Sequence, residues 1–325
     1  MTTPPPAPLG KANLDVFAAT LAELAPRHPE LLVVTGDSRG SAKLTAFCTT
    51  FPRQVVEVGI AEQNLVGVAA GLAMGGKRVF AVSPACFLTA RSLEQVKNDI
   101  AYSDHPVKLV GISAGVSYGA LGSTHHSLHD FAVLQAIHNI DIVIPADNYE
   151  TRQAILAAMD HPRPVYLRFG KRPLPDLYPD PKPVFEIGKA LKLAEGHDVA
   201  LLATGETVWR ALEASRLLAA RGLSCSVLSL HSLRPFDEAA VLEAARGCRA
   251  VLTVEEHSIH GGLGARVASL LMQSGLYRPF RIAGIPDEHT ITGSQEEIFQ
   301  HYGITPEGLA EMALELVPTL AEARP

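Results

Sequence analysis

The sequence lacks any apolar run long enough to cross a membrane. Its longest such stretch, Leu65 to Met74, is interrupted by Gly67 and Gly71 and falls short of the ~20 residues that a membrane helix needs. The N-terminus is rich in Thr and Pro and has neither the basic start nor the apolar segment of an export signal. We therefore predict a cytoplasmic protein in which residues 1–10 form a flexible tail and Leu65 to Met74 form a packed helix.

A strong charge of one sign and paired cysteines are also missing. The chain carries 28 Lys and Arg against 34 Asp and Glu, a formal net charge of -6, and has no basic run that would follow a nucleic-acid backbone. No C-x-x-C pair occurs among the four widely spaced cysteines, Cys48, Cys86, Cys225 and Cys248. These patterns disfavour a nucleic-acid partner, a zinc knuckle and a disulfide framework, and they predict reduced thiols.

What the sequence does contain is a regular alternation of short β-branched runs with segments of helical length. The runs are 31–35, 55–58, 78–82, 107–112, 141–144 and 164–169, and later 198–203, 224–230 and 249–255. This alternation is typical of mostly parallel sheets covered by helices. With 325 residues and 47% hydrophobic content, the chain is long enough for two such α/β domains.

Proline marks the predicted boundary between the two domains. Five prolines fall between Lys171 and Pro183, a density that supports neither a helix nor a central strand. We predict a first domain over 11–172, a linker over 173–185 and a smaller second domain over 186–325.

The most specific stretch runs from Val56 to Ala73 and reads V-E-V-G-I-A-E-Q-N-L-V-G-V-A-A-G-L-A. It predicts a buried strand, a turn at Gly59 and a helix with Glu62 in its first turn. Gly67 and Gly71 lie four apart on one face of that helix, where another backbone can approach closely. A carboxylate at this place often only complements the helix dipole, by about 0.3–1 kcal/mol, so its position alone does not make Glu62 functional.

The string G-I-A-E-Q-N, 59–64, resembles a hallmark of transketolases and deoxyxylulose-phosphate synthases. In that family the matching Glu hydrogen-bonds the aminopyrimidine ring of thiamine diphosphate and favours the imino tautomer. The ring nitrogen then removes a proton from the thiazolium carbon, which attacks a ketose or 2-oxoacid carbonyl. The resemblance implies this catalytic and cofactor-binding role for Glu62. It covers nearly the whole chain after residue 10, in the order of the second and third domains of a transketolase.

Two further segments agree with the resemblance. Residues 85–99, A-C-F-L-T-A-R-S-L-E-Q-V-K-N-D, look like the family segment whose aromatic side chain stacks on the pyrimidine, and this implies cofactor binding by Phe87. A Phe after a strand is, however, more often ordinary core. Residues 122–127, G-S-T-H-H-S, are similar to the family's G-x-T-H-Q, whose His contacts substrate and helps to move protons, and this implies that role for His125.

Other interpretations of the histidine segment remain open at this stage. Positions four apart can share a helix face, so His125 and His129 with His126 admit a metal site, but no H-E-x-x-H or third-ligand spacing supports it. Ser123 and Thr124 also suit a simple helix-capping role.

The chain departs from the family pattern in the same region. Transketolases usually carry an acidic pair just before G-x-T-H, where this chain has Ala120 and Leu121, and the family's earlier histidine aligns roughly with Ser113. Both losses argue against an ordinary pair of pentose-phosphate substrates.

Three more residues receive roles from the resemblance. Arg168, in R-P-V-Y-L-R-F-G-K-R, aligns with a family Arg that binds a substrate phosphate, although a surface ion pair is an equal alternative. Lys11 falls near another phosphate-binding position. Ser38, in G-D-S-R-G-S, lies in a loop that the family places beside the cofactor thiazole.

In the predicted second domain, E-E-H-S-I-H-G-G-L-G, 255–264, resembles the C-terminal signature of the same superfamily. A Gly-rich turn that opens a helix can bind an anion through free backbone N–H groups, but close packing is the commoner reason for such glycines. We expect no catalytic residue there.

The family holds the cofactor's diphosphate through Mg²⁺ on a G-D-G motif followed by an Asn, and no G-D-G occurs in this chain. A diphosphate needs a metal or a cluster of donors to offset its charge. The resemblance therefore implies a separate N-terminal-type partner subunit that carries G-D-G and holds Mg²⁺, most simply in an α₂β₂ assembly with a large apolar interface.

The resulting prediction is a β-type subunit of a thiamine-diphosphate-dependent transketolase that moves a two-carbon ketol unit between phosphorylated or modified sugars. The alternatives are the β subunit of a 2-oxoacid dehydrogenase first component and a non-catalytic homologue that only scaffolds a complete enzyme.

Overall fold

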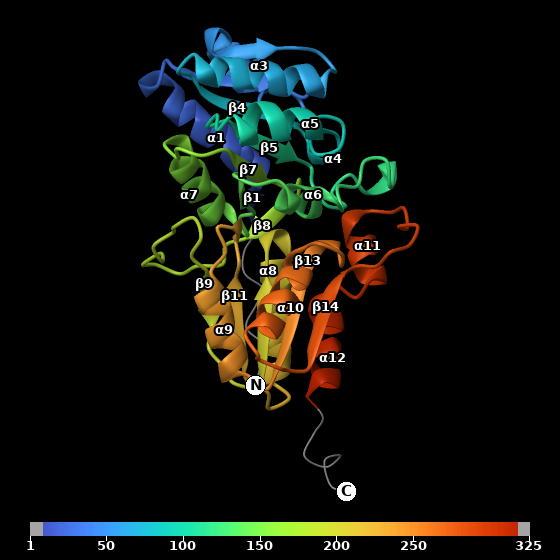
Figure 1. Ribbon diagram of the computed structural model, residues 1–325. Coiled ribbons are helices and arrows are strands. Elements are labelled where there is room, and N and C mark those ends of the chain that lie inside the picture. Colours follow the sequence, from blue (N-terminus) through green and yellow to red (C-terminus); the bar gives the residue numbers. More distant parts are fainter. Residues whose placement is uncertain (1–8, 318–325) are drawn as a thin grey trace, which may run out of the picture.

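The structure is a computed structural model, and it describes residues 9–317. Two α/β units are stacked end to end, the first blue to green and the second yellow to red in Figure 1. The predicted two-domain α/β fold with mostly parallel sheets is confirmed. No helix in residues 9–317 is long and apolar enough to cross a membrane.

The first unit is built on a seven-stranded sheet in the order β12-β6-β7-β5-β4-β2-β3. Its strands are β2 (Leu31–Thr35), β3 (Val55–Glu57), β4 (Arg78–Pro84), β5 (Lys108–Ile112), β6 (Asp141–Val143), β7 (Val165–Arg168) and β12 (Ser232–Arg234). All neighbours are parallel except β12, which runs antiparallel to β6. All six strands predicted in this half of the sequence form.

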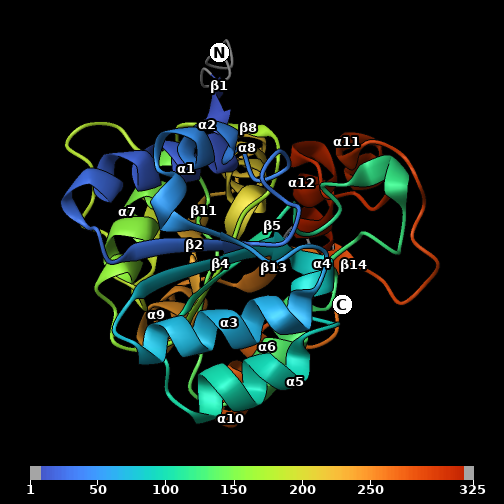
Figure 2. The ribbon, with the colours of Figure 1, turned by 90° about the horizontal axis from the view of Figure 1, so that it is seen from above.

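Helices cover both faces of this sheet, as Figure 2 shows from above. One face packs against α1 (Asn13–Leu24), α2 (Thr45–Thr50) and α7 (Asn148–Met159), and the other against α3 (Glu62–Met74), α5 (Leu93–Gln95) and α6 (Asp130–Ala136). Because side chains alternate along a strand, Val33 and Phe80 meet the first set of helices while Val34 and Ala81 meet the second. The remaining helical segments of this unit are η1 (Ala25–Arg27), η2 (Pro52–Gln54), α4 (Ala85–Leu88), η3 (Val96–Tyr102) and η4 (Gly119–Leu121).

The second unit has a five-stranded sheet in the order β14-β13-β10-β11-β9, in which only β9 is antiparallel to its neighbour. Its strands are β9 (Leu191–Ala194), β10 (Val199–Ala203), β11 (Cys225–Ser229), β13 (Ala250–Ser258) and β14 (Phe280–Ile285). Its helices are η5 (Gly205–Thr207), α8 (Val208–Ala219), α9 (Glu238–Gly247), α10 (Leu263–Gln273), α11 (Gln295–His301) and α12 (Pro306–Leu316). The core under α9 and α10 is continuous with the core under α3, so apolar packing does not stop at the junction.

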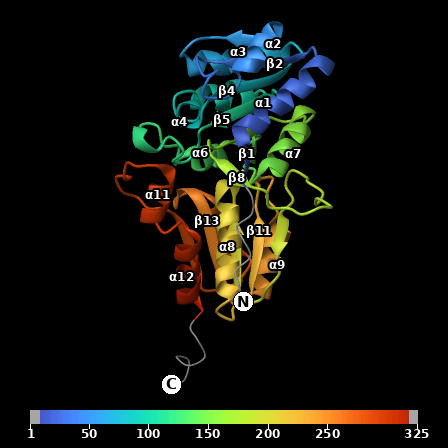
Figure 3. The same ribbon diagram turned by 180° about the vertical axis from the view of Figure 1, so that it is seen from behind.

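The junction is more ordered than its proline content predicts. Leu9 and Gly10, which the sequence assigns to a tail, begin strand β1 (Leu9–Ala12), and the rest of that tail lies outside the described residues. Strand β1 pairs with β8 (Pro173–Pro175) to form a two-stranded ribbon beside α7 (Figure 3). The proline-rich segment then continues along α7, where the Tyr178 hydroxyl donates to Glu150 at 2.5 Å.

Candidate active site

Glu62 lies where two loops converge at the carboxyl ends of the parallel strands β2 and β3, the edge at which α/β sheets usually bind ligands. A Cβ atom at Gly36 would lie 2.5 Å from the carbonyl oxygen of Gly59, so glycine allows the two loops to touch. Gly59 has φ +73°, a left-handed conformation that turns the chain into α3. Helix α3 begins at Glu62, whose side chain is only 4% exposed. The strand, turn and helix predicted around Glu62 are therefore present.

Among residues 9–317, the Glu62 carboxylate has one side-chain partner, which comes from the turn after α4. The Arg91 Nη1 atom lies 2.5 Å from Glu62 Oε2, and the Arg91 side chain is 49% exposed. The same guanidinium lies over the ring of Phe87, with Cζ 5.0 Å from the ring centroid. One planar cation thus bridges a buried carboxylate and an aromatic face.

Phe87 also begins a row of ring contacts that leads away from Glu62. The Phe87 and His125 ring centroids are 5.2 Å apart in an edge contact, and those of His125 and Tyr118 are 5.3 Å apart. The Lys171 Nζ atom lies 4.6 Å from the Tyr118 centroid. We call Arg91, Phe87, His125, Tyr118 and Lys171 the ring row. The structure thus brings together Glu62, Phe87 and His125, which the sequence places in three separate segments.

A cavity of about 460 Å³ lies beside the ring row. Its lining is made of Cys86, Phe87, Ala90, Arg91, Ser123, Thr124, His126 and His129. No carboxylate of the described part of the chain belongs to this lining, so Arg91 is its principal charge.

The three neighbouring histidines have different surroundings. The His126 ring is buried, and its Nε2 atom bonds to the Gly119 carbonyl at 3.0 Å, while burial lowers the pKa of the ring. His129 Nε2 lies 3.2 Å from the Thr89 hydroxyl, and the Thr124 hydroxyl lies 2.9 Å from His125 Nδ1. Within residues 9–317, no group of three or more His, Cys, Asp or Glu side chains is arranged to hold a metal ion.

The helix after this loop does not use the capping residues that the sequence suggested. Helix α6 begins at Asp130 with His129 as its N-cap, so Ser123 and Thr124 lie in the loop, several residues before it. They line the cavity beside the ring row instead.

Ser38 lies in the loop that follows β2. Its side chain is 4% exposed, and its hydroxyl donates to the Gly36 carbonyl at 3.1 Å. The loop is tied to β3 through the Glu57 carboxylate, which accepts from the backbone N–H of Asp37 at 2.8 Å and pairs with Arg39 at 2.9 Å. In the isolated chain Ser38 therefore stabilises the turn of its own loop.

Arg168 lies inside the protein, between the two units. Its Nε atom donates to Asp130 Oδ2 at 2.8 Å, its Nη2 atom donates to the Glu256 carbonyl at 2.9 Å, and its guanidinium lies over the Phe131 ring. Burial acts to raise the pKa of Asp130, but the charges of Arg168 and His257 and the hydrogen bonds from Arg168 and Tyr166 together outweigh it and lower that pKa, so Asp130 is ionised beside Arg168. With its side chain 4% exposed, Arg168 offers no accessible donor to a substrate phosphate.

Lys11 lies in β1, the strand that pairs with β8. Its backbone N–H donates to the Asn148 side chain of α7 at 2.7 Å, and it does not line the cavity beside Phe87. Among the described residues, neither Lys11 nor Arg168 hydrogen-bonds to Glu62 or His125 or lines this cavity.

The junction also contains a buried pair of carboxylates that no sequence pattern predicts. Gln295 Nε2 donates to Glu206 Oε2 at 3.0 Å and to Glu256 Oε1 at 2.7 Å. Burial, helped by the charge of Glu206, raises the pKa of Glu256 to about 7. Glu256 falls within the E-E-H string, but Glu206 and Gln295 belong to no motif, so only the fold could have joined them.

The glycine-rich turn 261–264 binds an anion that the chain itself supplies. The backbone N–H groups of Leu263 and Gly264, at the start of α10, donate to the Glu255 carboxylate at 2.7 and 2.8 Å. An internal carboxylate therefore occupies the position that an external anion would take.

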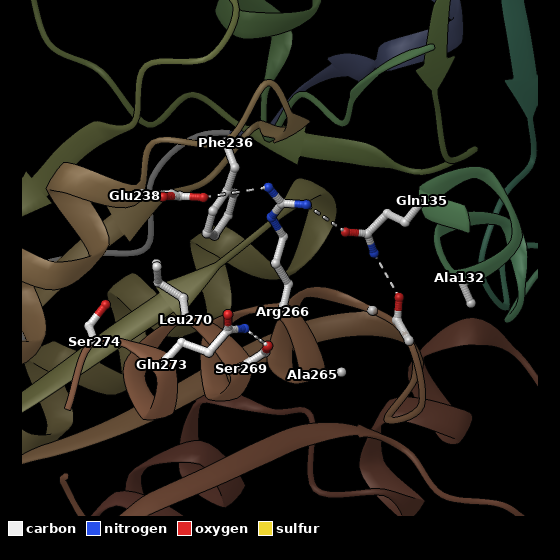
Figure 4. A pocket seen from close by; sticks show the side chains of 12 residues that line it. Ala132, Gln135, Phe236, Glu238, Ala265, Arg266, Ser269, Leu270, Gln273 and Ser274 are labelled. Carbon is white, nitrogen blue, oxygen red and sulfur yellow. Dashed lines mark hydrogen bonds and ion pairs between the residues drawn. The ribbon is translucent and has the colours of Figure 1, made fainter. Parts of the chain in front are cut away.

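A larger cavity, about 650 Å³, lies between α6 and α10, away from Glu62 (Figure 4). Two of its polar side chains donate hydrogen bonds to other residues of the lining. Gln135 donates to the Gly261 carbonyl at 2.7 Å, and Gln273 donates to the Ser269 hydroxyl at 2.7 Å. Arg266 lies over Phe236 and near Glu238. This cavity is larger, but Glu62, Phe87 and His125, the residues that the sequence predicts to be functional, lie at or beside the ring row.

Comparison with known proteins agrees with this fold. The family model described as "Transketolase, pyrimidine binding domain" matches residues 10–176, and "Transketolase, C-terminal domain" matches residues 188–309. The chain belongs to the transketolase family, of which it contains these two domains.

The more similar relatives are single subunits of transketolases. A subunit of the apulose-4-phosphate transketolase from Phocaeicola vulgatus is 48% identical over 301 residues, which cover 93% of this chain and 96% of that protein. A 6-deoxy-6-sulfo-D-fructose transketolase subunit from Clostridium sp. is 34% identical over 302 residues, which cover 93% of this chain and 93% of that protein. These relatives define a class of transferase subunits, and the chain is an enzyme subunit of that class.

Solved structures extend the comparison. A chain described as a split gene transketolase, inactive beta4 tetramer, matches with a TM-score of 0.86 at 34% identity, covering 95% of this chain and 100% of that one. A transketolase from Campylobacter jejuni matches with a TM-score of 0.80 at 19% identity, and this chain spans 48% of its length. The second likeness shows the fold alone.

Proposed function

We propose that the chain is the β-type subunit of a thiamine-diphosphate-dependent transketolase, which transfers a two-carbon ketol unit between sugar substrates. The observation that carries this proposal is that a buried carboxylate, Glu62, and an aromatic face, Phe87, are bridged by a single planar group. These are the two surfaces that an aminopyrimidine ring requires, one to share a proton and one to stack on.

The residues of the site fit the pyrimidine half of the cofactor. Glu62 would hold a proton at a ring nitrogen, and Phe87 would support the ring. Bound thiamine diphosphate supplies the carbon nucleophile for ketol transfer. The loop with Ser38 lies at the same sheet edge, and we propose that it adjoins the thiazole half.

His125 is the group we propose for substrate binding and proton transfer. Because the Thr124 hydroxyl lies 2.9 Å from Nδ1, Nε2 is the ring nitrogen left for a substrate oxygen. Contacts with Phe87 and Tyr118 on either side orient the imidazole.

For the anionic end of a substrate we propose Lys171 in place of Arg168 and Lys11. Lys171 is exposed, lies over Tyr118 at one end of the ring row, and has no ion-pair partner among the described residues. Arg168 has its donors committed to Asp130 and Glu256, so its effect on the reaction would be indirect.

We propose apulose-4-phosphate as the first donor to test. It is named in the 48%-identical relative, and the replacement of the family's acidic pair by Ala120 and Leu121 already argues against ordinary pentose phosphates. Leu121 is 55% exposed, so an apolar surface stands where transketolases usually present a carboxylate.

We further propose that the chain acts only with a partner subunit that carries a G-D-G motif and holds Mg²⁺, most simply as α₂β₂. The names of the relatives, which describe each of them as one subunit of a transketolase, support this proposal. So does the outer face of α3: apart from the adjoining residues and the backbone of α3 itself, no atom of the described chain lies within 4 Å of a Cβ built at Gly67 or Gly71. The close approach that their spacing predicts would therefore be made by another chain.

The test is turnover by the co-expressed complex of this chain with a G-D-G partner. Glu62→Gln keeps the shape but replaces the carboxyl group with an amide that cannot exchange a proton, so we expect kcat to fall about 10²–10⁴-fold while the complex still assembles. Glu94→Gln, an exposed Glu in α5, is the matched control and should leave kcat unchanged. Full activity of the Glu62→Gln complex, or no ketol transfer by the wild-type complex, would refute the proposal.

A further inference from the structure

Arg91 occupies the place between Glu62 and Phe87 that the proposed function gives to the pyrimidine. Its Nη1 atom lies 2.5 Å from the Glu62 carboxylate, and its Cζ atom lies 5.0 Å from the Phe87 ring centroid. A guanidinium is planar, donates hydrogen bonds in its plane and stacks on aromatic faces. Arg91 therefore presents to these two residues the same kind of surface as an aminopyrimidine.

The local charges explain why the arginine takes this place. Glu62 is 4% exposed and has no other side-chain partner in the described residues, so without Arg91 a buried carboxylate would be unpaired. A buried charge without a partner is costly, which favours the ion pair in the chain alone.

The same contacts make the arginine removable. The Arg91 side chain is 49% exposed. Among the described residues that line the adjacent cavity, no carboxylate is present that would hold the guanidinium in addition to Glu62. A half-exposed guanidinium can move into water at small cost, whereas Glu62 and Phe87 are fixed by α3 and α4.

From this geometry we propose that Arg91 is an internal stand-in for the cofactor's pyrimidine, and that the pyrimidine must displace it from Glu62 and Phe87 when the holoenzyme forms. This inference rests on the proposed function. Arg91 then stabilises the unassembled chain and weakens cofactor binding, so it is a competitor of the ligand and takes no part in the chemistry.

The first test is calorimetric titration of the co-expressed complex with thiamine diphosphate and Mg²⁺. Arg91→Met keeps the length of the side chain but removes the guanidinium, so we expect a Kd about fivefold lower than that of the wild type. Arg152→Met is the matched control, since Arg152 also forms a half-exposed ion pair, with Glu23 at 2.7 Å, on the opposite face of the sheet. It should leave the Kd unchanged.

A second test uses the chain alone and needs no cofactor. Arg91→Met should lower the Tm of the wild-type chain but leave the Tm of a Glu62→Gln chain nearly unchanged, because the partner charge is already absent.

The outcomes separate this inference from the proposed function. If the wild-type complex binds the cofactor and Arg91→Met binds it equally or more weakly, the stand-in role is refuted while the transketolase proposal survives. If the wild-type complex does not bind the cofactor, both are refuted. Equal Tm losses in the two backgrounds would refute the ion pair itself.

Discussion

Arg168 and Lys171, two cationic residues three positions apart, show that the accessibility of a side chain, and not its type alone, decides whether it can bind a ligand. Arg168 is the last residue of a central strand, so its side chain is buried against the second unit and is neutralised by Asp130. Lys171 follows the end of the strand and reaches Tyr118 from the surface. The resemblance favours the first because Arg suits phosphate, but burial decides which cation a ligand can reach.

Substitution of these two residues should give opposite results. Arg168→Met leaves Asp130 charged and unpaired, and we expect it to lower the free energy of unfolding by about 3–5 kcal/mol. Lys171→Met should change stability by less than about 0.5 kcal/mol but raise the KM for a phosphorylated sugar.

Urea unfolding of the chain and steady-state kinetics of the complex measure the two effects. A stable Arg168→Met protein with a raised KM would restore the phosphate role to Arg168, and an unchanged KM for Lys171→Met would remove that role from Lys171.

At the scale of elements, the two units meet through carboxylates that press against glycines. A Cβ atom at Gly170 would lie 1.8 Å from Glu206 Oε1, and one at Gly115 would lie 2.2 Å from the Glu256 Cδ atom. Glu206 follows β10 and Glu256 lies in β13, so the carboxyl ends of the second sheet point into the backbone of the first unit. The glycines allow this contact because they have no side chain.

Gly170→Ala should therefore disturb the junction. The new methyl group would collide with a buried carboxylate, and we expect a loss of about 1–3 kcal/mol in the free energy of unfolding. Gly247 ends α9, and a Cβ added there would lie within 4 Å of no atom beyond its adjoining residues and the backbone of α9, so Gly247→Ala should leave stability unchanged or raise it by up to about 1 kcal/mol. Equal denaturation midpoints for Gly170→Ala and the wild type would contradict the close contact.

Much of this arrangement was predictable from sequence because the strands are short, β-branched and regularly spaced. The helix at Glu62 was predictable from its turn and its first residues. The β1–β8 ribbon was not, because Pro173 and Pro175 disfavour a strand and only pairing with Leu9–Ala12 makes one. The pairing of Glu62 with Arg91 and the link through Gln295 join residues far apart in sequence, which local patterns do not connect.

At the scale of the whole molecule, the junction couples stability to pH. Glu256 is buried, faces Glu206, Gln295 and Arg168, and has a pKa raised from 4.5 to about 7 by burial and then by Glu206. The folded chain holds this proton where the unfolded chain has released it. The contribution of Glu256 to stability is therefore full below pH 4.5 and is lost as the pH rises toward 7.

Glu256→Gln should remove this dependence because an amide does not ionise. Relative to the wild type, its free energy of unfolding should rise between pH 5 and pH 8, by about 3 kcal/mol at most, since each pH unit is worth about 1.36 kcal/mol. The comparison is made by urea unfolding at each pH. Glu195→Gln, whose carboxylate is 84% exposed, should show a flat difference, and a flat difference for Glu256→Gln would contradict the raised pKa.

Strand β12 belongs to the second unit in sequence but completes the sheet of the first, where it pairs with β6. After the proline-rich segment the chain enters the second unit and then returns to the first unit as β12. A cut in that segment therefore does not divide the molecule into two complete domains. In the N-terminal fragment, β6 would be an unpaired edge strand that can pair with a strand of another molecule. The fragment would also lose the core contacts of Leu233. For recombination between family members, the transferable unit is thus the described chain in one piece.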